Sequence, residues 1–305
     1  MEKQKLIVIL GPTASGKTDL SVALAKKYGG EIISADSRQV YRGLDIGSGK
    51  ITKSQMRGIP HHLLDVANPK KRFTVAQYQK LALKAVKQIQ DYGKIPFLVG
   101  GTGFYIQSVI DGIAIPEIKP NWKLRKELEV KSVGQLFLML KKLDPTRAAN
   151  IDPKNPRRLV RAIEIVMTTK KPVPPSYLYT PVYKDDILQI GIKKSPKELK
   201  KLISRRLQKR IKGIVAEVKK LHSPAQVGKN GLSWKRLEEL GLEYRFVAQY
   251  LQQKTPYQEM INKIQMESEH FAKRQMTWFK RDERIHWIKN QKEAEKLIRK
   301  FCLPR

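Results

Sequence analysis

Residues 11–18 read Gly-Pro-Thr-Ala-Ser-Gly-Lys-Thr, which is the complete pattern of a phosphate-binding loop. Glycines allow such a loop to wrap an anion, with amide N–H groups and the start of the following helix pointing at the negative charge. Lys17 would reach the terminal phosphates, and the Thr18 hydroxyl would ligate Mg²⁺, the cofactor that we expect. The expected phosphate contacts are Gly11, Thr13, Ala14, Ser15, Gly16, Lys17 and Thr18.

The loop does not reveal which polyphosphate it holds. A nucleotide-hydrolysing enzyme with such a loop usually has another strand that ends in an acidic Mg²⁺ ligand. Here the matching apolar strand runs into Gly100-Gly101-Thr102-Gly103, which supplies a hydroxyl and backbone amides. A kinase of a small molecule or an RNA end remains an alternative, with Asp36 as its base. A non-catalytic RNA-binding protein with a relict loop is another.

A phosphate-binding loop must lie between a strand and a helix, and the flanking residues predict both. We expect apolar strands at residues 5–10, 31–35, 95–99, 187–192 and 285–288, and helices at 18–28 and between Thr74 and Gly93. Buried strands that are separated by helices imply a parallel sheet. The sequence therefore predicts an α/β fold, in which residues 1–116 and 187–305 form a P-loop NTPase-like parallel sheet core flanked by helices.

Residues 117–186 carry a different pattern, in which proline-bearing turns separate short helical stretches. Leu136, Leu140 and Leu143 share one face, and Leu159, Ala162, Ile163 and Val166 share another. We expect a helical insertion domain here. The rest of the core is expected to be mainly helical, at 196–221, 234–251 and 257–280, with a last helix after residue 288. His61 and His62 are expected to shape a turn, because no acidic or cysteine partner is spaced to complete a metal site.

The charge is strongly positive and uneven. The chain has 61 Lys and Arg against 28 Asp and Glu, a net charge of +33, and residues 117–305 carry 44 and 20 of these, a net +24. This sign favours a polyanion such as nucleic acid, although a solvated lysine-rich surface would look the same. The single cysteine, Cys302, excludes a disulfide framework. Apolar runs fall short of the roughly 18 residues of a membrane span, and we expect a soluble, cytoplasmic protein.

Further motifs continue the phosphate-binding loop along the chain. They are residues 34–47 (Ser-Ala-Asp-Ser-Arg-Gln-Val-Tyr-Arg-Gly-Leu-Asp-Ile-Gly), 60–65 (Pro-His-His-Leu-Leu-Asp), 99–103 (Val-Gly-Gly-Thr-Gly), 155–162 (Asn-Pro-Arg-Arg-Leu-Val-Arg-Ala) and 272–279 (Ala-Lys-Arg-Gln-Met-Thr-Trp-Phe). In this order they resemble the tRNA dimethylallyltransferase, or isopentenyl-tRNA transferase, family over about residues 6–288. Members of that family transfer the dimethylallyl group of dimethylallyl diphosphate to the exocyclic amine of the adenosine just 3′ of the tRNA anticodon.

The resemblance implies roles for individual residues. Asp36 would orient the amine and take its proton, Thr102 would hydrogen-bond the diphosphate side of the scissile bond, and Arg206 would bind the diphosphate. The implied tRNA contacts are Asp36, Ser37, Arg38, Gln39, Thr102, Arg125, Arg157, Arg158, Arg161, Tyr244, Arg245, Lys273 and Arg274. The implied partners are dimethylallyl diphosphate and the tRNA anticodon stem-loop, which the insertion domain and other parts of the chain would hold. We expect no membrane partner, and we expect the protein to be a monomer.

Purely structural roles stay open as alternatives for some of these residues. Asp36 is also a good turn residue, and the three arginines of residues 155–162 could lie on a solvated helix face. The chain departs from the family near residue 241, where many bacterial members have a Gly-Tyr-Lys/Arg-Glu run. Here Tyr244 and Arg245 are kept, but Glu243 and Phe246 replace the glycine and the glutamate. The departure concerns the contacts to the anticodon loop.

Overall fold

The computed structural model describes residues 5–113, 115–116, 118–174, 186–223 and 231–303. The chain divides into two compact units, Asp111–Pro181 and the remainder. The smaller unit is helical and the larger one holds the sheet, and the division falls a few residues before the positions 117 and 186 that the sequence suggested.

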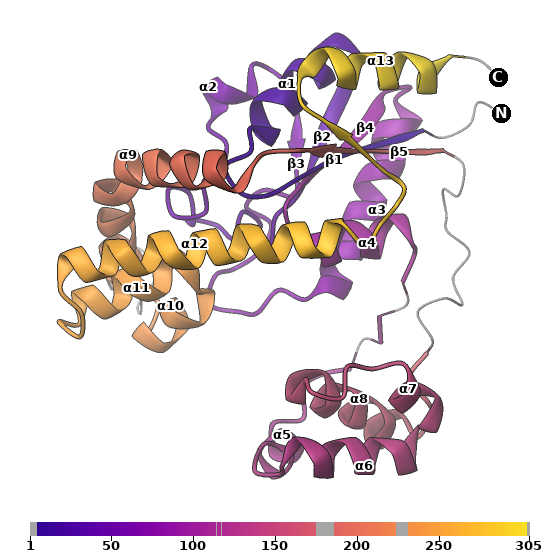
Figure 1. Cartoon of the computed structure of the whole chain (residues 1–305), viewed down its shortest axis with the longest axis vertical. Helices are drawn as coiled ribbons and strands as arrows, with labels where there is room; N and C mark the ends of the chain where they lie inside the picture. Colours follow the sequence, from indigo (N-terminus) through magenta and orange to yellow (C-terminus); the bar gives the residue numbers. More distant parts are fainter. Residues whose placement is uncertain (1–4, 114, 117, 175–185, 224–230, 304–305) are drawn as a thin grey trace. The chain divides into compact units, whose positions relative to one another are not determined.

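The larger unit is built on a six-stranded parallel sheet (Figure 1). Its strands are β1 (Leu6–Leu10), β2 (Gly30–Ala35), β3 (His61–His62), β4 (Ile95–Gly100), β5 (Ile187–Ile192) and β6 (Ile285–Ile288), in the order β3-β2-β4-β1-β5-β6. The expected α/β fold is thus confirmed. His61 and His62 were expected in a turn, but they pair with β2 as a short edge strand. His62 Nε2 lies 2.7 Å from the Glu31 carboxylate, which fixes the pair at the sheet edge.

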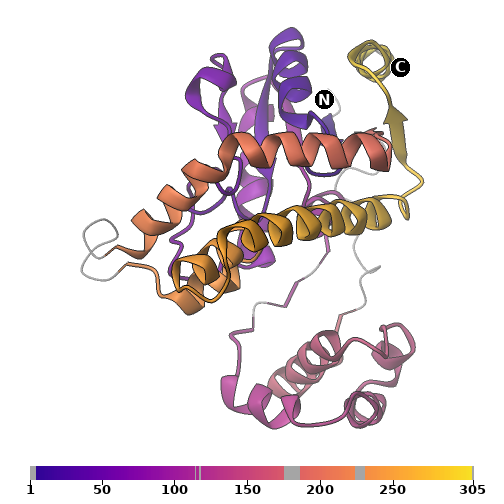
Figure 2. The ribbon, with the colours of Figure 1, turned by 60° about the vertical axis from the view of Figure 1, so that its left-hand side comes forward.

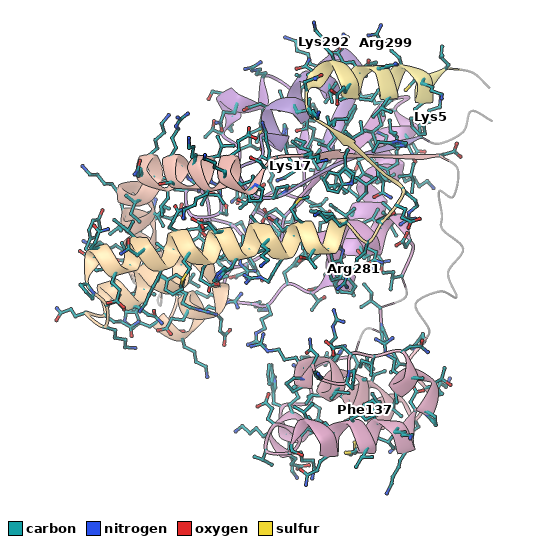
Figure 3. All side chains as sticks on the ribbon, viewed as in Figure 1. Lys5, Lys17, Phe137, Arg281, Lys292 and Arg299 are labelled. Atoms are coloured by element: carbon teal, nitrogen blue, oxygen red, sulfur yellow. The ribbon has the colours of Figure 1, made fainter. Side chains whose placement is uncertain are left out.

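The strands are apolar throughout because helices cover both faces of the sheet. On β1, Leu6, Val8 and Leu10 pack with α3 (Val75–Asp91) and α4 (Gly103–Ile110), whereas Ile7 and Ile9 pack with α1 (Lys17–Lys27) and α13 (Gln291–Cys302). Helix α13 buries a narrow stripe, and its charged side chains Lys292 and Arg299 point outward (Figure 3). Because the strands are parallel, their C-terminal ends lie at the same end of the sheet, where α1 follows β1 and α4 follows β4.

A group of helices follows β5 and extends beyond the C-terminal ends of the strands. They are α9 (Pro196–His222), α10 (Trp234–Leu240), α11 (Leu242–Leu251) and α12 (Tyr257–Phe279), and α9, α11 and α12 pack against one another (Figure 2). A continuous helix over 234–251 was expected, but it is broken at Gly241. This residue has φ of 76°, a value that glycine adopts without strain. A four-residue helix, α2 (Lys53–Met56), lies in the segment between β2 and β3.

The smaller unit contains α5 (Trp122–Glu129), α6 (Val133–Leu143), α7 (Pro145–Ala149) and α8 (Pro156–Thr169). Its helices start at clear caps: Ser132 and Gln135 form a capping box before α6, and Asn155 caps α8 with proline in the first turn. The core joins the two expected apolar faces, through Leu136 and Leu140 on α6 and Leu159 and Ile163 on α8. Leu143, which was expected with them, is exposed.

Candidate active site

The phosphate-binding loop joins β1 to α1, as its sequence requires. Gly16, the residue before α1, has φ of 90° and provides no side chain to cap the helix, so the first amides of α1 face outward for an anion. Gly11 has φ of 153°, and an added Cβ there would lie 3.2 Å from Ser15 Oγ, so it shapes the loop rather than lining a pocket. Residues 13–18 line a pocket of about 760 Å³.

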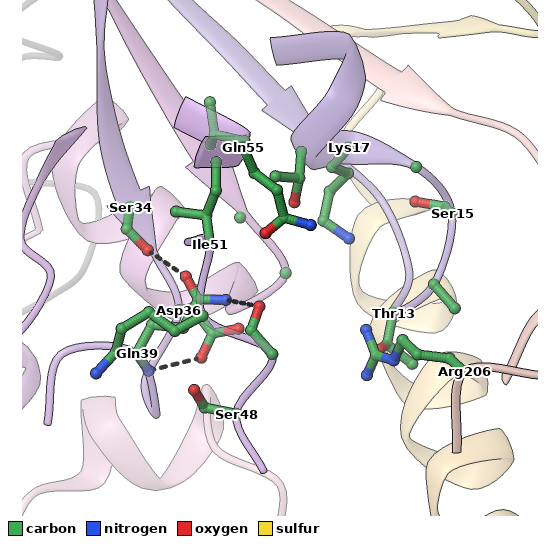
Figure 4. A pocket seen from close by; sticks show the side chains of 18 of the residues that line it. Thr13, Ser15, Lys17, Ser34, Asp36, Gln39, Ser48, Ile51, Gln55 and Arg206 are labelled. Carbon is green, nitrogen blue, oxygen red and sulfur yellow. Dashed lines mark hydrogen bonds between the residues drawn. The ribbon is translucent and has the colours of Figure 1, made fainter. Parts of the chain in front are cut away.

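Two chemically different sides form this pocket (Figure 4). One side carries the phosphate-binding loop and, from α9, the guanidinium group of Arg206, with Lys209 and Arg210 on the same helix. The other side carries Asp36, Gln39, Ser48 and Ile51, which follow β2. A cationic surface and a carboxylate therefore share one cavity.

Lys17 is half-buried beside the loop, and its Nζ donates a hydrogen bond to the Pro12 carbonyl at 2.6 Å. Burial, and to a lesser extent the positive charge of Arg206, lower the pKa of Lys17 to about 7, while Asp36 acts in the opposite direction. A diphosphate at this position would supply the negative charge that restores the ammonium form. Lys17 is thus poised to change its protonation when an anion binds.

Two helices hold the loop at Thr13. Arg206 Nη2 on α9 donates to Thr13 Oγ1 at 2.9 Å, so the structure brings Arg206 to the phosphate side as expected. Gln275 on α12 accepts from Thr13 N at 2.8 Å and donates to the Gly101 carbonyl at 2.8 Å. Sequence reasoning did not single out Gln275 as a site residue. Gln275 is a polar residue on the buried face of α12, which is otherwise mostly apolar. This departure from the apolar pattern is the sequence signal for a functional role.

Asp36 follows β2 and has two kinds of contact. Its Oδ1 accepts from Arg38 N at 2.8 Å and from Gln39 N at 3.3 Å, which is the turn role that the sequence left open. Its Oδ2 has no hydrogen-bond partner among the described residues, and the side chain lines the pocket. Thr102 Oγ1 accepts from Ser37 N at 3.1 Å and does not line the pocket, so Thr102 supports the Asp36 turn and its position does not support the expected diphosphate contact.

The expected tRNA contacts of the larger unit differ in accessibility. Arg245 on α11 and Lys273 and Arg274 on α12 are exposed, as an RNA-binding role requires. Arg38 is half-buried, and its Nε donates to the Leu240 carbonyl at 2.5 Å. Tyr244 is only 1% exposed, because its ring packs in the core and its hydroxyl donates to Glu217. A side chain in that position cannot touch RNA, so the expectation for Tyr244 was wrong.

The four arginines of the smaller unit also fall into two groups. Arg157 and Arg158 are exposed on the first turn of α8. Arg125 and Arg161 instead bind the carboxylate of Glu164, at 2.7 and 2.6 Å, and Glu164 is fully buried. Burial alone would raise the pKa of Glu164, but the hydrogen bonds from both arginines hold it below its ordinary value. Arg125 and Arg161 therefore have a structural partner, which the sequence interpretation did not foresee.

The pocket has the polar atoms that an anion with a bound cation would need. Ser15 Oγ and Arg210 Nη2 line it and have no hydrogen-bond partner in the described part of the chain, although buried polar atoms normally have one. In the same part of the chain no three His, Cys, Asp or Glu residues gather to hold a metal ion. Mg²⁺ needs no such cage, because it commonly keeps its waters and binds phosphate oxygens with one or two protein oxygens. The Thr18 hydroxyl on the pocket wall fits that requirement.

The sequence is similar to those of known proteins. The sequence model of the IPP transferase family matches residues 39–282. The chain belongs to the IPP transferase family. The tRNA dimethylallyltransferase of Carboxydothermus hydrogenoformans is 40% identical over 98% of this chain and 96% of its own length. Another relative of the same name, from Halalkalibacterium halodurans, is 39% identical over 94% of this chain and 91% of its own length.

Solved structures of IPP transferases share the fold. The full-length tRNA isopentenylpyrophosphate transferase from Bacillus halodurans superposes with a TM-score of 0.69 at 36% identity, covering 98% of this chain and 95% of its own. A eukaryotic dimethylallyltransferase acting on tRNA superposes with a TM-score of 0.75 at 27% identity, covering 90% of this chain and 69% of its own. Within the described residues of this IPP transferase, no helix is long and apolar enough to cross a membrane.

Proposed function

We propose that this IPP transferase moves the dimethylallyl group of dimethylallyl diphosphate to the exocyclic amine of the adenosine 3′-adjacent to the tRNA anticodon. The products are N6-isopentenyladenosine and diphosphate. The observation that carries the proposal is that a phosphate-binding loop and the carboxylate of Asp36 line the same pocket. The relatives named tRNA dimethylallyltransferase support the same reaction.

The phosphate side of the pocket suits the departing diphosphate. The amides at the start of α1, the ammonium of Lys17 and the guanidinium of Arg206 place positive charge where negative charge grows as the carbon–oxygen bond breaks. Mg²⁺ bound by the Thr18 hydroxyl and the diphosphate would neutralise part of that charge. No nucleoside triphosphate is needed, because the donor itself carries the leaving group.

The carboxylate side suits the acceptor. The exocyclic amine of adenine is a poor nucleophile because its lone pair is delocalised into the ring, so a base must orient it and take a proton as the carbon–nitrogen bond forms. Asp36 has one oxygen fixed by the turn and the other free for that proton. The target adenosine is stacked in the anticodon loop and has to leave the stack to reach this carboxylate.

Charge on the protein surface suits the remaining phosphates of the RNA. Arg157, Arg158, Lys273 and Arg274 are exposed, and the segment from residue 117 onward carries a net charge of +24. Counterion release from the anticodon stem-loop would drive this binding. We also propose that the protein acts on cytoplasmic tRNA as a monomer.

The test of this function is to determine which compound the protein needs in order to modify tRNA. Purified protein is incubated with unmodified tRNA and Mg²⁺, with dimethylallyl diphosphate, with ATP, or with both, and the nucleosides are identified by mass spectrometry. We expect isopentenyladenosine with dimethylallyl diphosphate alone and no product with ATP alone. A phosphorylated product, or prenylation that depends on ATP, would contradict the proposal and favour a kinase.

A further inference from the structure

Residues 45–51, called the wall segment here, line the pocket without belonging to a helix or a strand. Asp45, Ile46, Ser48, Gly49, Lys50 and Ile51 all contribute to the lining. In Figure 4, Ser48 and Ile51 lie with Asp36, across the pocket from Thr13 and Arg206. Since no sheet or helix ladder fixes this backbone, other groups must hold its amides.

One buried carboxylate holds three successive amides of the wall segment. Glu217 on α9 is 9% exposed, and it accepts hydrogen bonds from the backbone N–H groups of Asp45 at 3.0 Å, Ile46 at 2.5 Å and Gly47 at 3.0 Å. Hydrogen bonds to an ionised acceptor are stronger than bonds between neutral groups. The carboxylate therefore fixes the start of the wall segment to α9.

Tyr244 on α11 completes the attachment. Its hydroxyl donates to Glu217 at 2.7 Å and accepts from Ser48 N at 3.1 Å, so four successive amides are bound by two side chains. The ring also packs on Gly47, where an added Cβ would lie 2.5 Å from the ring carbon Cζ. Burial, and then the Glu217 carboxylate, raise the pKa of Tyr244 well above its ordinary value, so the phenol stays protonated and donates.

The same helix that carries Glu217 also carries the cationic side of the pocket. Arg206 and Arg210 lie about two to three turns before Glu217 on α9, and Arg210 lies so close to Gly49 that an added Cβ would be 3.1 Å from its Nη1. The Ile46 side chain packs on Gly213 of α9 in a similar way. The attachment by Glu217 thus sets how far the wall segment stands from the groups that would bind the diphosphate.

We propose that Glu217 and Tyr244 are positioning residues that hold the wall segment as the apolar surface against the five-carbon group of the donor. The inference rests on the proposed function. Ile46 and Ile51 supply apolar side chains to a pocket whose other side is cationic, and the donor has the same division between an apolar tail and a charged head. A wall that is fixed before binding contacts the tail without an ordering cost.

The test compares Tyr244→Phe and Glu217→Gln with wild type, and uses Tyr28→Phe as a matched control. The Tyr28→Phe variant also loses one hydroxyl hydrogen bond, the one that Tyr28 donates to the Glu295 carbonyl. Tyr28 does not line the pocket. We expect the KM for dimethylallyl diphosphate to rise about tenfold in both test variants, as loss of about one charged hydrogen bond allows. The KM for tRNA and the dissociation constant for inorganic diphosphate should change less than about twofold, because the exposed cations proposed for the RNA and the phosphate-binding loop lie outside the wall segment.

A second measurement does not depend on catalysis. Hydrogen exchange of the amides of residues 45–48 should be faster in both test variants than in wild type and in Tyr28→Phe, with exchange in β1 unchanged. An unchanged KM for dimethylallyl diphosphate, or unchanged amide exchange in a folded Tyr244→Phe protein, would overturn the inference. A parallel rise of all three constants would also overturn it, since it indicates general loss of structure. If wild type fails to prenylate tRNA, the proposed function fails instead, and the amide exchange still decides whether these residues hold the wall segment.

Discussion

Binding of dimethylallyl diphosphate should take up a proton at Lys17. Burial holds the pKa of this ammonium group at about 7 in the unliganded pocket. At pH 8 only about a tenth of the molecules then carry the charge, whereas a bound diphosphate raises the pKa by several units and makes protonation nearly complete. The expected uptake is therefore about 0.9 proton per donor bound at pH 8, and only about 0.1 at pH 6. Affinity should accordingly fall by up to about tenfold per pH unit above pH 7.

The uptake is measured by isothermal titration calorimetry at pH 8 in two buffers that differ in their enthalpy of ionisation. The change in binding enthalpy between the buffers gives the number of protons taken up. A phosphate group has its last pKa near about 6, so the ligand itself is almost fully ionised at pH 8. The Lys17→Arg variant is the control, because the guanidinium group of arginine remains charged at all of these pH values. Equal binding enthalpies in the two buffers for wild type would refute the assignment of Lys17 as a group with a lowered pKa that contacts the diphosphate.

The remaining predictions concern the acceptor side, the RNA and the supports of the site. Asp36→Asn should lower kcat by about 10² or more with little change in tRNA affinity, measured by single-turnover kinetics and filter binding; near-normal turnover would remove Asp36 from the chemistry. Alanine at both Arg157 and Arg158 should lower the slope of log affinity for tRNA against log KCl by about two, and an identical slope would mean a solvated face. Glu164→Ala should lower the free energy of unfolding by about 3 kcal/mol in denaturant titrations, because two arginines lose their buried partner, and a change below about 1 kcal/mol would contradict this. Gln275→Leu should weaken the binding of inorganic diphosphate about tenfold by releasing the loop; unchanged binding would show that the loop holds its shape alone.

The sequence predicts the sheet core well because the signals are local. A strand such as β1 is apolar at every position, and a helix such as α3 begins at the capping box of Thr74 and Gln77, so both can be recognised without tertiary information. The elements that the sequence does not predict lack such a local signal. Strand β3 has only the two polar residues His61 and His62, which give no strand signal, and its pairing depends on β2.

The candidate site is predictable only where a motif fixes the backbone. The phosphate-binding loop is such a motif, and Lys17 and Thr18 lie where it places them. Contacts across the chain are a different matter: the hydrogen bond between Thr13 and Gln275 spans 262 residues, and that between Ile46 and Glu217 spans 171. No spacing in the sequence indicates them.

Resemblance to a family places a residue in the chain but does not tell whether its side chain is buried. For that reason Tyr244 was expected on the RNA surface and is instead in the core, with Glu217 as its partner. Arg161 was expected to contact tRNA, and in the structure it binds Glu164. The contact between Tyr244 and Glu217 joins two helices, so only the structure reveals it. Glu164 lies three residues after Arg161 on the same helix, a spacing at which side chains meet, but the sequence does not show that Glu164 is buried.

Prenylation of the adenosine beside the anticodon is the central claim, and mapping the product on a short RNA tests it most directly. An anticodon stem-loop with adenosine at the position 3′ of the anticodon is incubated with the protein, dimethylallyl diphosphate and Mg²⁺, next to a stem-loop with guanosine at that position. Fragment mass spectrometry then locates any added five-carbon group. We expect one isopentenyl group, on that adenosine, and none on the guanosine stem-loop. Modification of both RNAs, or of neither while dimethylallyl diphosphate still binds the pocket, would contradict the claim.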